Sequence, residues 1–201
     1  MKLETLIVAT GNKHKLQEIQ EIFSGVRVIS AREAGYTGDP EETGKTFEEN
    51  AIIKARAAAE ALNLPALADD SGLCVETLGG EPGIYSARYA GGHGDDKKNR
   101  EKLLHELRGA ENRAAYFRSA VALCYPQSAG GGTVVATGET HGRILTDEEG
   151  ENGFGYDCLF YSDDLKKSFG VASAEEKNSV SHRFRALTAL KAKLENGDGK
   201  Q

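Results

Sequence analysis

The sequence predicts a mixed α/β fold, and two kinds of pattern support this prediction. Near the N-terminus an apolar run, Leu6–Ala9, is followed by a turn and then by apolar residues at helical spacing, which indicates a strand–turn–helix unit. Near the middle, two long strand-like segments, 114–125 and 134–145, flank the loop Gly130-Gly131-Gly132 and are expected to form a hairpin. A chain with helix-linked and hairpin-linked strands is expected to build a sheet with parallel and antiparallel neighbours.

Length and composition suit a soluble globular protein. The chain has 201 residues, of which 39% are hydrophobic and 28% charged, which fits one domain or one domain with two lobes. No apolar run approaches the roughly 20 residues that a membrane-spanning helix needs. The apolar start of the chain is too short for a signal peptide. We therefore expect a cytoplasmic protein with no membrane partner.

Charge and cysteine usage argue against several classes of protein. The net charge of −6 argues against a protein that coats nucleic acid, because binding a phosphate backbone needs a basic surface. A small phosphorylated ligand needs only a few local cations and remains compatible with this charge. Cys74, Cys124 and Cys158 are far apart and lack metal-ligand spacing, so neither a disulfide framework nor a zinc site is expected.

The first half of the chain alternates strands and helices. After the strand at Leu6–Ala9, an apolar stripe from Leu16 to Phe23 predicts a helix, and Val26–Ile29 predicts a second strand. Thr46 and Glu49 have the spacing of a capping box that opens an Ala-rich helix to about Leu62. Further strands are expected at 65–69 and at 73–76.

The second half adds the hairpin and three helices. Asp95 or Asp96 is expected to cap a helix that reaches Arg108. The remaining predicted elements are a strand at 157–161, a helix opened by a capping box of Ser173 and Glu176, and a last helix that begins at Ser181. The tail at 196–201 is expected to fray.

Two adjacent carboxylates, Asp69 and Asp70, follow an apolar strand and precede Ser71 and Gly72. Carboxylates at the end of a strand, beside a turn, suit an enzyme that holds a hard divalent cation. Because successive side chains of a strand point to opposite faces, only one of the two carboxylates needs to face such a site. The alternative is an ordinary polar turn, since all four residue types favour turns.

Two segments suit a phosphorylated ligand. The first segment consists of Thr10, Gly11, Asn12, Lys13, His14 and Lys15. It combines a glycine, two lysines and the expected start of a helix, which are the features of a phosphate-binding site. Lys177 and the run Ser181-His182-Arg183 place further donors at the start of the last helix. In both segments the simpler alternative is a surface helix with solvated charges.

Three smaller groups complete the candidates. Glu41 and Glu42 form a second acidic pair, and magnesium usually takes only one or two protein carboxylates. Asn50 and Lys54 share one helix face, although such residues more often face water. In Gly153–Asp157 an aromatic residue between two glycines could stack on a flat ring, or the segment could be a plain turn.

Six segments in this order resemble the inosine triphosphatase family of inosine/xanthosine triphosphate pyrophosphatases. They lie at 7–15, 41–51, 68–73, 82–89, 153–157 and 176–183, with the sequences IVATGNKHK, EETGKTFEENA, ADDSGL, PGIYSARY, GFGYD and EKNSVSHR. The resemblance extends over about residues 6–194.

The resemblance implies a house-cleaning enzyme that hydrolyses non-standard purine triphosphates (ITP, dITP and XTP) to the monophosphate and pyrophosphate. It implies Mg²⁺ as cofactor, with Mn²⁺ as a substitute, and a homodimer. It also implies a single domain over residues 1–195 with an elongated, two-lobed α/β fold, a long mixed sheet flanked by helices and a central nucleotide cleft.

The same matching assigns roles to residues. Asp70 is expected to be the proton acceptor and, with Glu41, a metal ligand, while Asp69 and Glu42 stay open as further ligands. Substrate contacts are expected from Thr10, Gly11, Asn12, Lys13, His14, Lys15, Ser71, Phe154, Gly155, Tyr156, Asp157, Lys177, His182 and Arg183. Two residues depart from the family pattern: Cys158 stands where proline is usual and Phe184 where glycine is common. Phe184 puts in question the shape of the base pocket or the start of the last helix.

Two other functions stay open from the sequence. One is a pyrophosphatase of similar fold that acts on another nucleotide, such as a modified pyrimidine triphosphate. The other is a nucleotide sensor without turnover, although the presence of Glu41, Asp70 and Lys15 speaks against it. For the purine enzyme, donors at His182 and Arg183 would pair with the 6-oxygen of hypoxanthine or xanthine and meet the amino group of adenine unfavourably.

Overall fold

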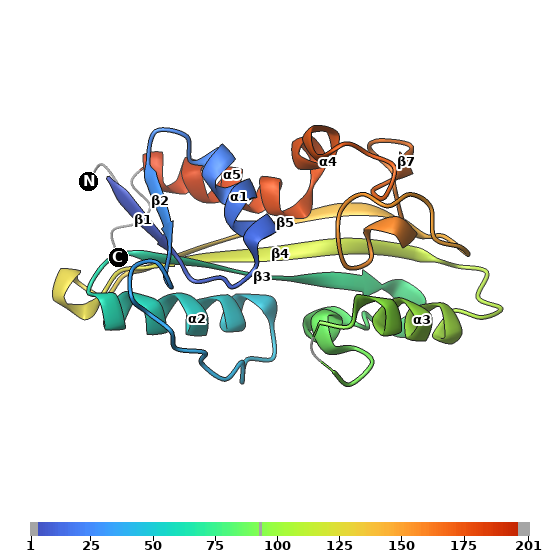
Figure 1. Cartoon of the computed structure of the whole chain (residues 1–201), viewed down its shortest axis with the longest axis horizontal. Coiled ribbons are helices and arrows are strands. Elements are labelled where there is room, and N and C mark those ends of the chain that lie inside the picture. Colours follow the sequence, from blue (N-terminus) through green and yellow to red (C-terminus); the bar gives the residue numbers. More distant parts are fainter. Residues whose placement is uncertain (1–3, 93, 197–201) are drawn as a thin grey trace. The chain divides into compact units, whose positions relative to one another are not determined.

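The computed structural model describes residues 4–92 and 94–196 and contains one seven-stranded sheet in the order β2-β1-β3-β4-β5-β6-β7 (Figure 1). β1 (Thr5–Val8) runs parallel to β2 (Arg27–Ser30) and to β3 (Ala66–Val75). β6 (Phe160–Ser162) runs antiparallel to β5 (Thr133–Ile144) and to β7 (Lys167–Ser168). With β4 (Ala114–Cys124) between β3 and β5, the predicted mixed sheet is confirmed.

Five α-helices accompany these strands in the described part of the chain. They are α1 (Lys13–Ile22), α2 (Phe47–Leu62), α3 (Asp96–Glu106), α4 (Ala174–Val180) and α5 (His182–Glu195). None of these helices has the length and apolar character that crossing a membrane requires. Most of the expected tail, residues 197–201, lies outside the described residues.

The chain divides into two compact units, and each has its own core. Unit 1 consists of the described parts of Met1–Asp70, Ser119–Gly138 and Arg183–Gln201, and unit 2 of those of Ser71–Arg118 and Glu139–His182. Strands β3, β4 and β5 each contribute residues to both units.

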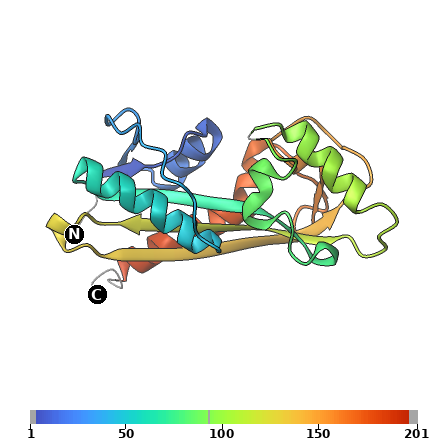
Figure 2. The same cartoon turned by 90° about the horizontal axis from the view of Figure 1, so that it is seen from below.

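Unit 1 packs helices on both sides of its strands. α1 and α5 lie on one side and α2 on the other, as Figure 1 and, seen from below, Figure 2 show. Its core joins strand residues such as Leu6, Leu67 and Val121 to Ile19 of α1 and Leu187 of α5, all of which are buried. Burial of these apolar side chains fixes α1 and α5 against the strands of unit 1.

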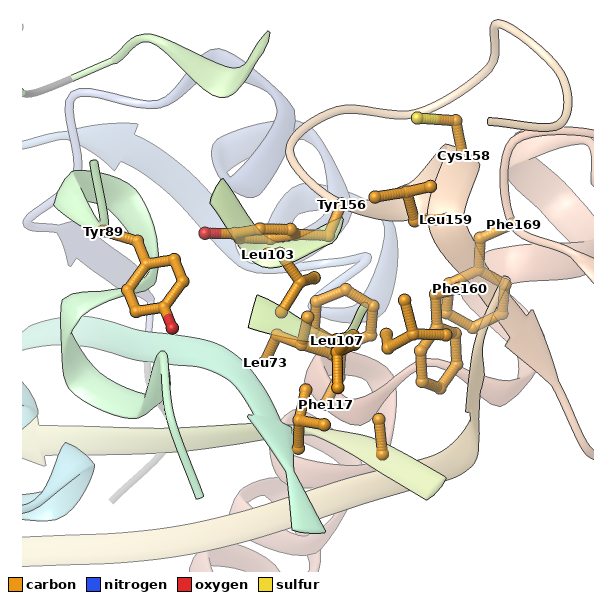
Figure 3. Close-up of a cluster of buried hydrophobic side chains, with 13 residues drawn as sticks. Leu73, Tyr89, Leu103, Leu107, Phe117, Tyr156, Cys158, Leu159, Phe160 and Phe169 are labelled. Carbon is orange, nitrogen blue, oxygen red and sulfur yellow. The ribbon is translucent and has the colours of Figure 1, made fainter. Parts of the chain in front are cut away.

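Unit 2 is built around an aromatic core. Phe117, Phe160 and Phe169 pack together there, with ring centroids 4.7 to 6.2 Å apart (Figure 3). Leu103 of α3 and Leu107, which directly follows the helix, are buried in the same core. The buried face of α3 thereby fixes the helix against the segment that contains Tyr156, which belongs to the same core.

Three predictions about elements were wrong. Asp69-Asp70-Ser71-Gly72 is not a turn between two strands, because all four residues lie within the uninterrupted strand β3 (Ala66–Val75). The expected strand at 157–161 begins with a 3₁₀ turn at Asp157–Leu159, and only then does β6 start. The capping box of α2 is half made: Thr46 accepts a hydrogen bond from the N–H of Glu49, but the Glu49 carboxylate accepts from the N–H of Lys45.

Candidate functional site

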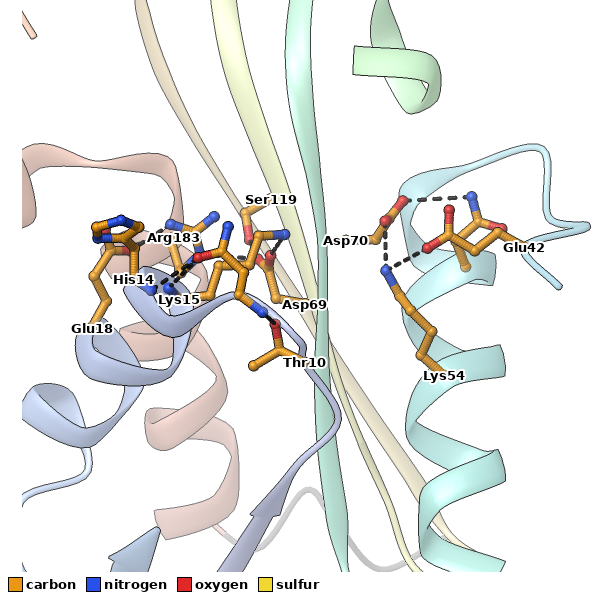
Figure 4. A network of polar contacts seen from close by, with 12 residues as sticks. Thr10, His14, Lys15, Glu18, Glu42, Lys54, Asp69, Asp70, Ser119 and Arg183 are labelled. Carbon is orange, nitrogen blue, oxygen red and sulfur yellow. Dashed lines mark hydrogen bonds and ion pairs between the residues drawn. The ribbon is translucent and has the colours of Figure 1, made fainter. Parts of the chain in front are cut away.

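The two adjacent acids of β3 face opposite sides of the strand (Figure 4). Asp69 points toward α1 and α5, and Asp70 points toward α2. Both side chains are buried, with 3% and 8% of their residue surface exposed. The alternation expected from strand geometry is therefore confirmed, and it gives two identical groups different partners.

Asp69 is surrounded by donors. Its carboxylate accepts hydrogen bonds from Lys15 Nζ and Ser119 Oγ, each at 2.5 Å, and lies 3.4 Å from Arg183 Nε. Burial alone would raise the pKa of Asp69, but the charges of Arg183 and Lys15 outweigh it and hold the pKa well below its usual range. Asp69 is therefore a fixed anion that orients two cations.

The start of α1 places Lys15 in this cluster. Asn12 caps the helix, because its side chain accepts hydrogen bonds from the N–H groups of His14 and Lys15. Thr10 Oγ1 accepts from the N–H of Asn12 at 3.1 Å. Lys13 and His14 are exposed, whereas Lys15 is half-buried. A helix start with adjacent lysines attracts anions, so this part of unit 1 suits the phosphate groups of a ligand.

Arg183, in the first turn of α5, has only 1% of its surface exposed. Its guanidinium forms ion pairs with Glu18 of α1 and with Asp69 of β3. Burial would lower the pKa of Arg183, but Asp69 and Glu18 outweigh burial and raise it. The buried cation is thus held between two anions and oriented before any ligand arrives.

Asp70 has a different set of partners. Lys54 Nζ of α2 lies 2.7 Å from Asp70 Oδ1 and 3.0 Å from Glu42 Oε1, so two carboxylates converge on one ammonium group (Figure 4). Asn50 Nδ2 donates to Asp70 Oδ2 at 3.5 Å. Burial raises the pKa of Asp70, because the lowering effects of Lys54 and Lys15 do not cancel it. A carboxylate whose pKa is raised toward neutrality is the better proton acceptor.

The acidic loop before α2 is tied to this cluster through Asn50. The N–H of Gly44 donates to Asn50 Oδ1 at 2.9 Å. A Cβ atom at position 44 would lie 2.5 Å from that oxygen, so the close approach requires glycine. The structure brings Glu42 to Lys54 and leaves Glu41 exposed.

The donor set around Asp70 fits a hard divalent cation. Asp70 and Glu42 supply carboxylate oxygens that already attract a positive group, the Lys54 ammonium. In residues 4–92 and 94–196, no group of three or more His, Cys, Asp or Glu side chains gathers as a ready metal cage. Such sparse carboxylates match the way magnesium is bound through few protein ligands, water and substrate phosphates.

Unit 2 contains the other predicted contacts. Lys177 Nζ donates to Asp157 Oδ2 at 2.6 Å and lies 4.6 Å from the centre of the Phe154 ring. His182 stacks on Phe117, with the ring centroids 4.9 Å apart and the planes at 15°. Lys177, Asp157 and His182 are buried, and Phe154 and Ser71 are half-buried. The structure therefore brings Phe154, Asp157 and Lys177 together within unit 2.

Asn50 and Lys54, which the sequence offers as candidates from their spacing on one helix face, both contact Asp70. Ser119 and Glu18 were not among the predicted site residues, although Ser119 could be found as a polar residue on the apolar face of a strand. Glu18 gives no such signal, because its partner Arg183 lies 165 positions away in the sequence.

Known proteins share much of this sequence. A profile of the Ham1 family matches residues 6–193. A Haemophilus influenzae protein named dITP/XTP pyrophosphatase is 48% identical over 196 residues, which cover 95% of this chain and 99% of that protein. A Bacillus subtilis protein of the same name is 47% identical over 197 residues, covering 96% of this chain and 98% of the relative.

Solved structures show the same fold. The Ham1 protein of Staphylococcus aureus superposes with a TM-score of 0.87 at 45% identity, covering 96% of this chain and 98% of that one. A HAM1 protein from Coxiella burnetii gives a TM-score of 0.87 at 38% identity, covering 98% of this chain and 100% of that one. The family profile covers nearly the whole chain, and the relatives are almost 50% identical in sequence and share its fold. The chain therefore belongs to the Ham1 family.

Proposed function

We propose that this protein is a nucleoside triphosphate pyrophosphatase that hydrolyses ITP, dITP and XTP to the monophosphate and pyrophosphate. The observation that carries the proposal is the pair of adjacent acids on β3. One is locked to Lys15 and Arg183, and the other is held by Lys54 with a raised pKa. This pair occurs in a chain that is 48% identical to a protein named dITP/XTP pyrophosphatase.

The reaction uses Asp70 as the proton acceptor. The oxygen of a water molecule attacks the α-phosphorus, the bond from this phosphorus to the bridging oxygen breaks, and pyrophosphate leaves. One proton of the water passes to the Asp70 carboxylate, and the other stays on the attacking oxygen, which becomes part of the monophosphate. Lys15 and the start of α1 hold the phosphates, and their positive charge offsets the negative charge of the triphosphate as the nucleophile approaches.

Magnesium is the proposed cofactor, with manganese as a substitute. Asp70 is a proposed ligand together with an acid of the Glu41-Glu42 pair, and Glu42 is the one already directed toward Lys54. When bound, the ion would supply positive charge to the phosphate oxygens. Lys54, which contacts both Glu42 and Asp70, orients these carboxylates in the same region.

The remaining predicted substrate contacts are part of the proposal. Phe154, Gly155, Tyr156 and Asp157 would receive the base, and donors of His182 and Arg183 would pair with its 6-oxygen. Ser71 and Lys177 would add contacts to the nucleotide. A buried donor that meets the amino group of adenine is left unpaired, which selects against ATP.

A panel of nucleoside triphosphates with detection of released pyrophosphate tests the function. We expect turnover of ITP, dITP and XTP, weak turnover of ATP and GTP, and loss of all turnover when a chelator removes the metal. Preference for a modified pyrimidine triphosphate would point to the second candidate substrate class. Nucleotide binding without pyrophosphate release in the presence of Mg²⁺ would refute the proposed activity.

Assembly and location are also proposals. We propose a homodimer that acts in the cytoplasm on free nucleotides, without nucleic acid or membrane as partner. Light scattering coupled to size-exclusion chromatography tests the dimer, because a mass near 21.6 kDa, that of one chain, would contradict it.

A further inference from the structure

Helix α3 holds one residue of the segment proposed to receive the base. The N–H of Gly155 donates to Asp96 Oδ2 at 2.9 Å, and the carbonyl oxygen of Gly155 accepts from Arg100 Nη1 at 3.0 Å. Both contacts lie within unit 2. Asp96 and Arg100 therefore bind both backbone polar groups of a single glycine.

The sequence of α3 keeps these two side chains available for the contacts. Asp95, and not Asp96, caps the helix by accepting from the N–H of Lys98. Asp96 and Arg100 are four residues apart and so share a face of the helix. Arg100 is fixed from the other side, because its Nε donates to Glu148 Oε1 at 2.7 Å.

The helix itself is anchored. Asn99, with 2% of its surface exposed, accepts a hydrogen bond from the N–H of Ala90 and donates to the carbonyl oxygen of Ala87. Leu103 of α3 is fully buried in the core of unit 2. Asp96 and Arg100 thus project from a rigid support, which is what a positioning residue needs.

The segment has a second set of anchors. Asp157 Oδ2 accepts from the N–H of Phe154 at 2.9 Å, and the Tyr156 hydroxyl donates to the carbonyl oxygen of Ser86 at 2.8 Å. Between these anchors lies Gly155, whose φ of +62° is a conformation that few other residues adopt. A glycine has the most backbone freedom to lose, so its conformation depends on the contacts from α3.

A cavity leaves room for this segment to move. It has a volume of about 350 Å³ and is lined by Asp96, Arg100, Glu148, Phe154 and Gly155, among others. Because space is open on the α3 side, packing alone does not hold Gly155 there. The hydrogen bonds of Asp96 and Arg100 provide the restraint.

We propose that Asp96 and Arg100 are positioning residues for base recognition. They fix the backbone of Gly155, hold the neighbouring Phe154 ring beside Lys177, and thereby set how strongly the enzyme prefers purines that carry a 6-oxygen. This inference rests on the proposed function.

The test compares Asp96→Ala and Arg100→Met with two matched variants. Asp95→Ala removes the helix cap but leaves both contacts to Gly155, so it reports the effect of a weakened α3 alone. Asp96→Asn keeps an acceptor oxygen and is expected to rescue. For each variant we would measure amide hydrogen exchange of residues 153–157 by NMR, together with kcat and KM for ITP and ATP.

We expect Asp96→Ala to speed exchange of the Gly155 amide and to raise the KM for ITP about tenfold, which corresponds to about 1.4 kcal/mol. The kcat should change less than KM, and the preference for ITP over ATP should fall. Arg100→Met should act in the same direction. Asp95→Ala should lower the melting temperature while leaving exchange at Gly155 and the ITP/ATP preference at wild-type values.

Unchanged exchange at Gly155 in both variants, or an unchanged ITP/ATP preference despite faster exchange, would overturn the proposal. So would an Asp95→Ala variant that reproduces the loss of preference, because a weakened helix would then explain it. The substrate panel on the wild-type enzyme distinguishes failure of this positioning role from failure of the proposed function. A wild-type enzyme without preference for ITP refutes the proposed function and the base-recognition role together, whereas lost preference in the variants alone supports the positioning role.

Discussion

At the scale of single residues, two neighbouring aspartates with the same chemistry have different partners and opposite shifts in pKa. Asp69 faces three donors, and its pKa is well below the usual range, so it stays ionised. Asp70 has a raised pKa, with burial as the leading cause and Glu42 as a nearby like charge. The first is suited to hold cations in place and the second to accept a proton.

The variant Asp70→Asn tests the second role. The amide has nearly the same shape but cannot accept the proton of the attacking water, so kcat should fall by about 10² to 10⁴, the usual contribution of a general base. Circular dichroism and the melting temperature should stay close to wild type. Near-normal turnover by the purified, folded variant would remove Asp70 from this role.

The variant Asp69→Asn tests the first role through the pH dependence of stability. At pH 7 the variant leaves the half-buried Lys15 and the buried Arg183 without their shared counter-charge, which should cost about 3 to 5 kcal/mol of unfolding free energy. The low pKa of Asp69 in the folded state means that the unfolded chain binds the proton first as pH falls. The wild type should therefore lose up to about 1.4 kcal/mol per pH unit below about pH 3.9.

Urea unfolding at pH 7, 5 and 3 measures this effect. The difference in unfolding free energy between wild type and Asp69→Asn should be constant from pH 7 to 5 and smaller at pH 3. A difference that is the same at all three values would show that the Asp69 charge does not stabilise the fold.

Sequence reasoning at this scale succeeded where the chemistry is local. The opposite orientation of Asp69 and Asp70 follows from strand geometry, and the cap at Ser173 from helix geometry. The partners of these residues are far away in sequence: Ser119 reaches Asp69 across 50 positions and Glu18 reaches Arg183 across 165. Such pairings depend on how elements pack, which no local pattern contains.

At the scale of elements, α2 supports the Asp70 cluster by presenting Asn50 and Lys54 from one face. The helix begins with Thr46, whose hydroxyl accepts from the N–H of Glu49 at 3.1 Å. Thr46→Ala should lower the unfolding free energy by about 1 kcal/mol, because a helix start loses its cap. Thr46→Ser keeps the hydroxyl and should stay close to wild type in urea unfolding. Equal losses in both variants would assign the effect to the methyl group.

Two of the three elements predicted wrongly are explained by contacts that their carboxylates make. Residues of the type Asp-Asp-Ser-Gly favour turns in isolation, yet in β3 their side chains find partners on both sides of the strand. Tertiary contacts thus override local preference. Likewise, the buried Asp157 carboxylate accepts from the N–H of Phe154 and from Lys177 Nζ, which supports a 3₁₀ turn where a strand was expected.

At the scale of the whole molecule, metal and nucleotide should bind together. Only a few carboxylates surround Lys54, so Mg²⁺ alone should raise the melting temperature little. Mg²⁺ with a non-hydrolysable ITP analogue should raise it by several degrees, because a ligand stabilises the state that binds it. Differential scanning fluorimetry measures both shifts. A shift with Mg²⁺ alone as large as with the pair would contradict a metal site completed by substrate.

The fold class was predictable because the alternation of strand and helix patterns determines it, and the match to the Ham1 family confirms it. The division into two units, each with its own buried cluster, could not be read from periodicity, because β3, β4 and β5 pass through both. The two lobes of a single domain over 1–195, the central cleft and the homodimer stay predictions.

The uninterrupted course of β3 makes its length as important as its composition. Deleting or inserting one residue between Ala66 and Asp69 would rotate every later side chain of the strand to the other side. The proton acceptor would then meet Arg183 and Lys15, and the locked acid would meet Lys54, although no functional residue had been lost. Length changes in this strand should therefore abolish turnover even though they remove none of the proposed functional residues.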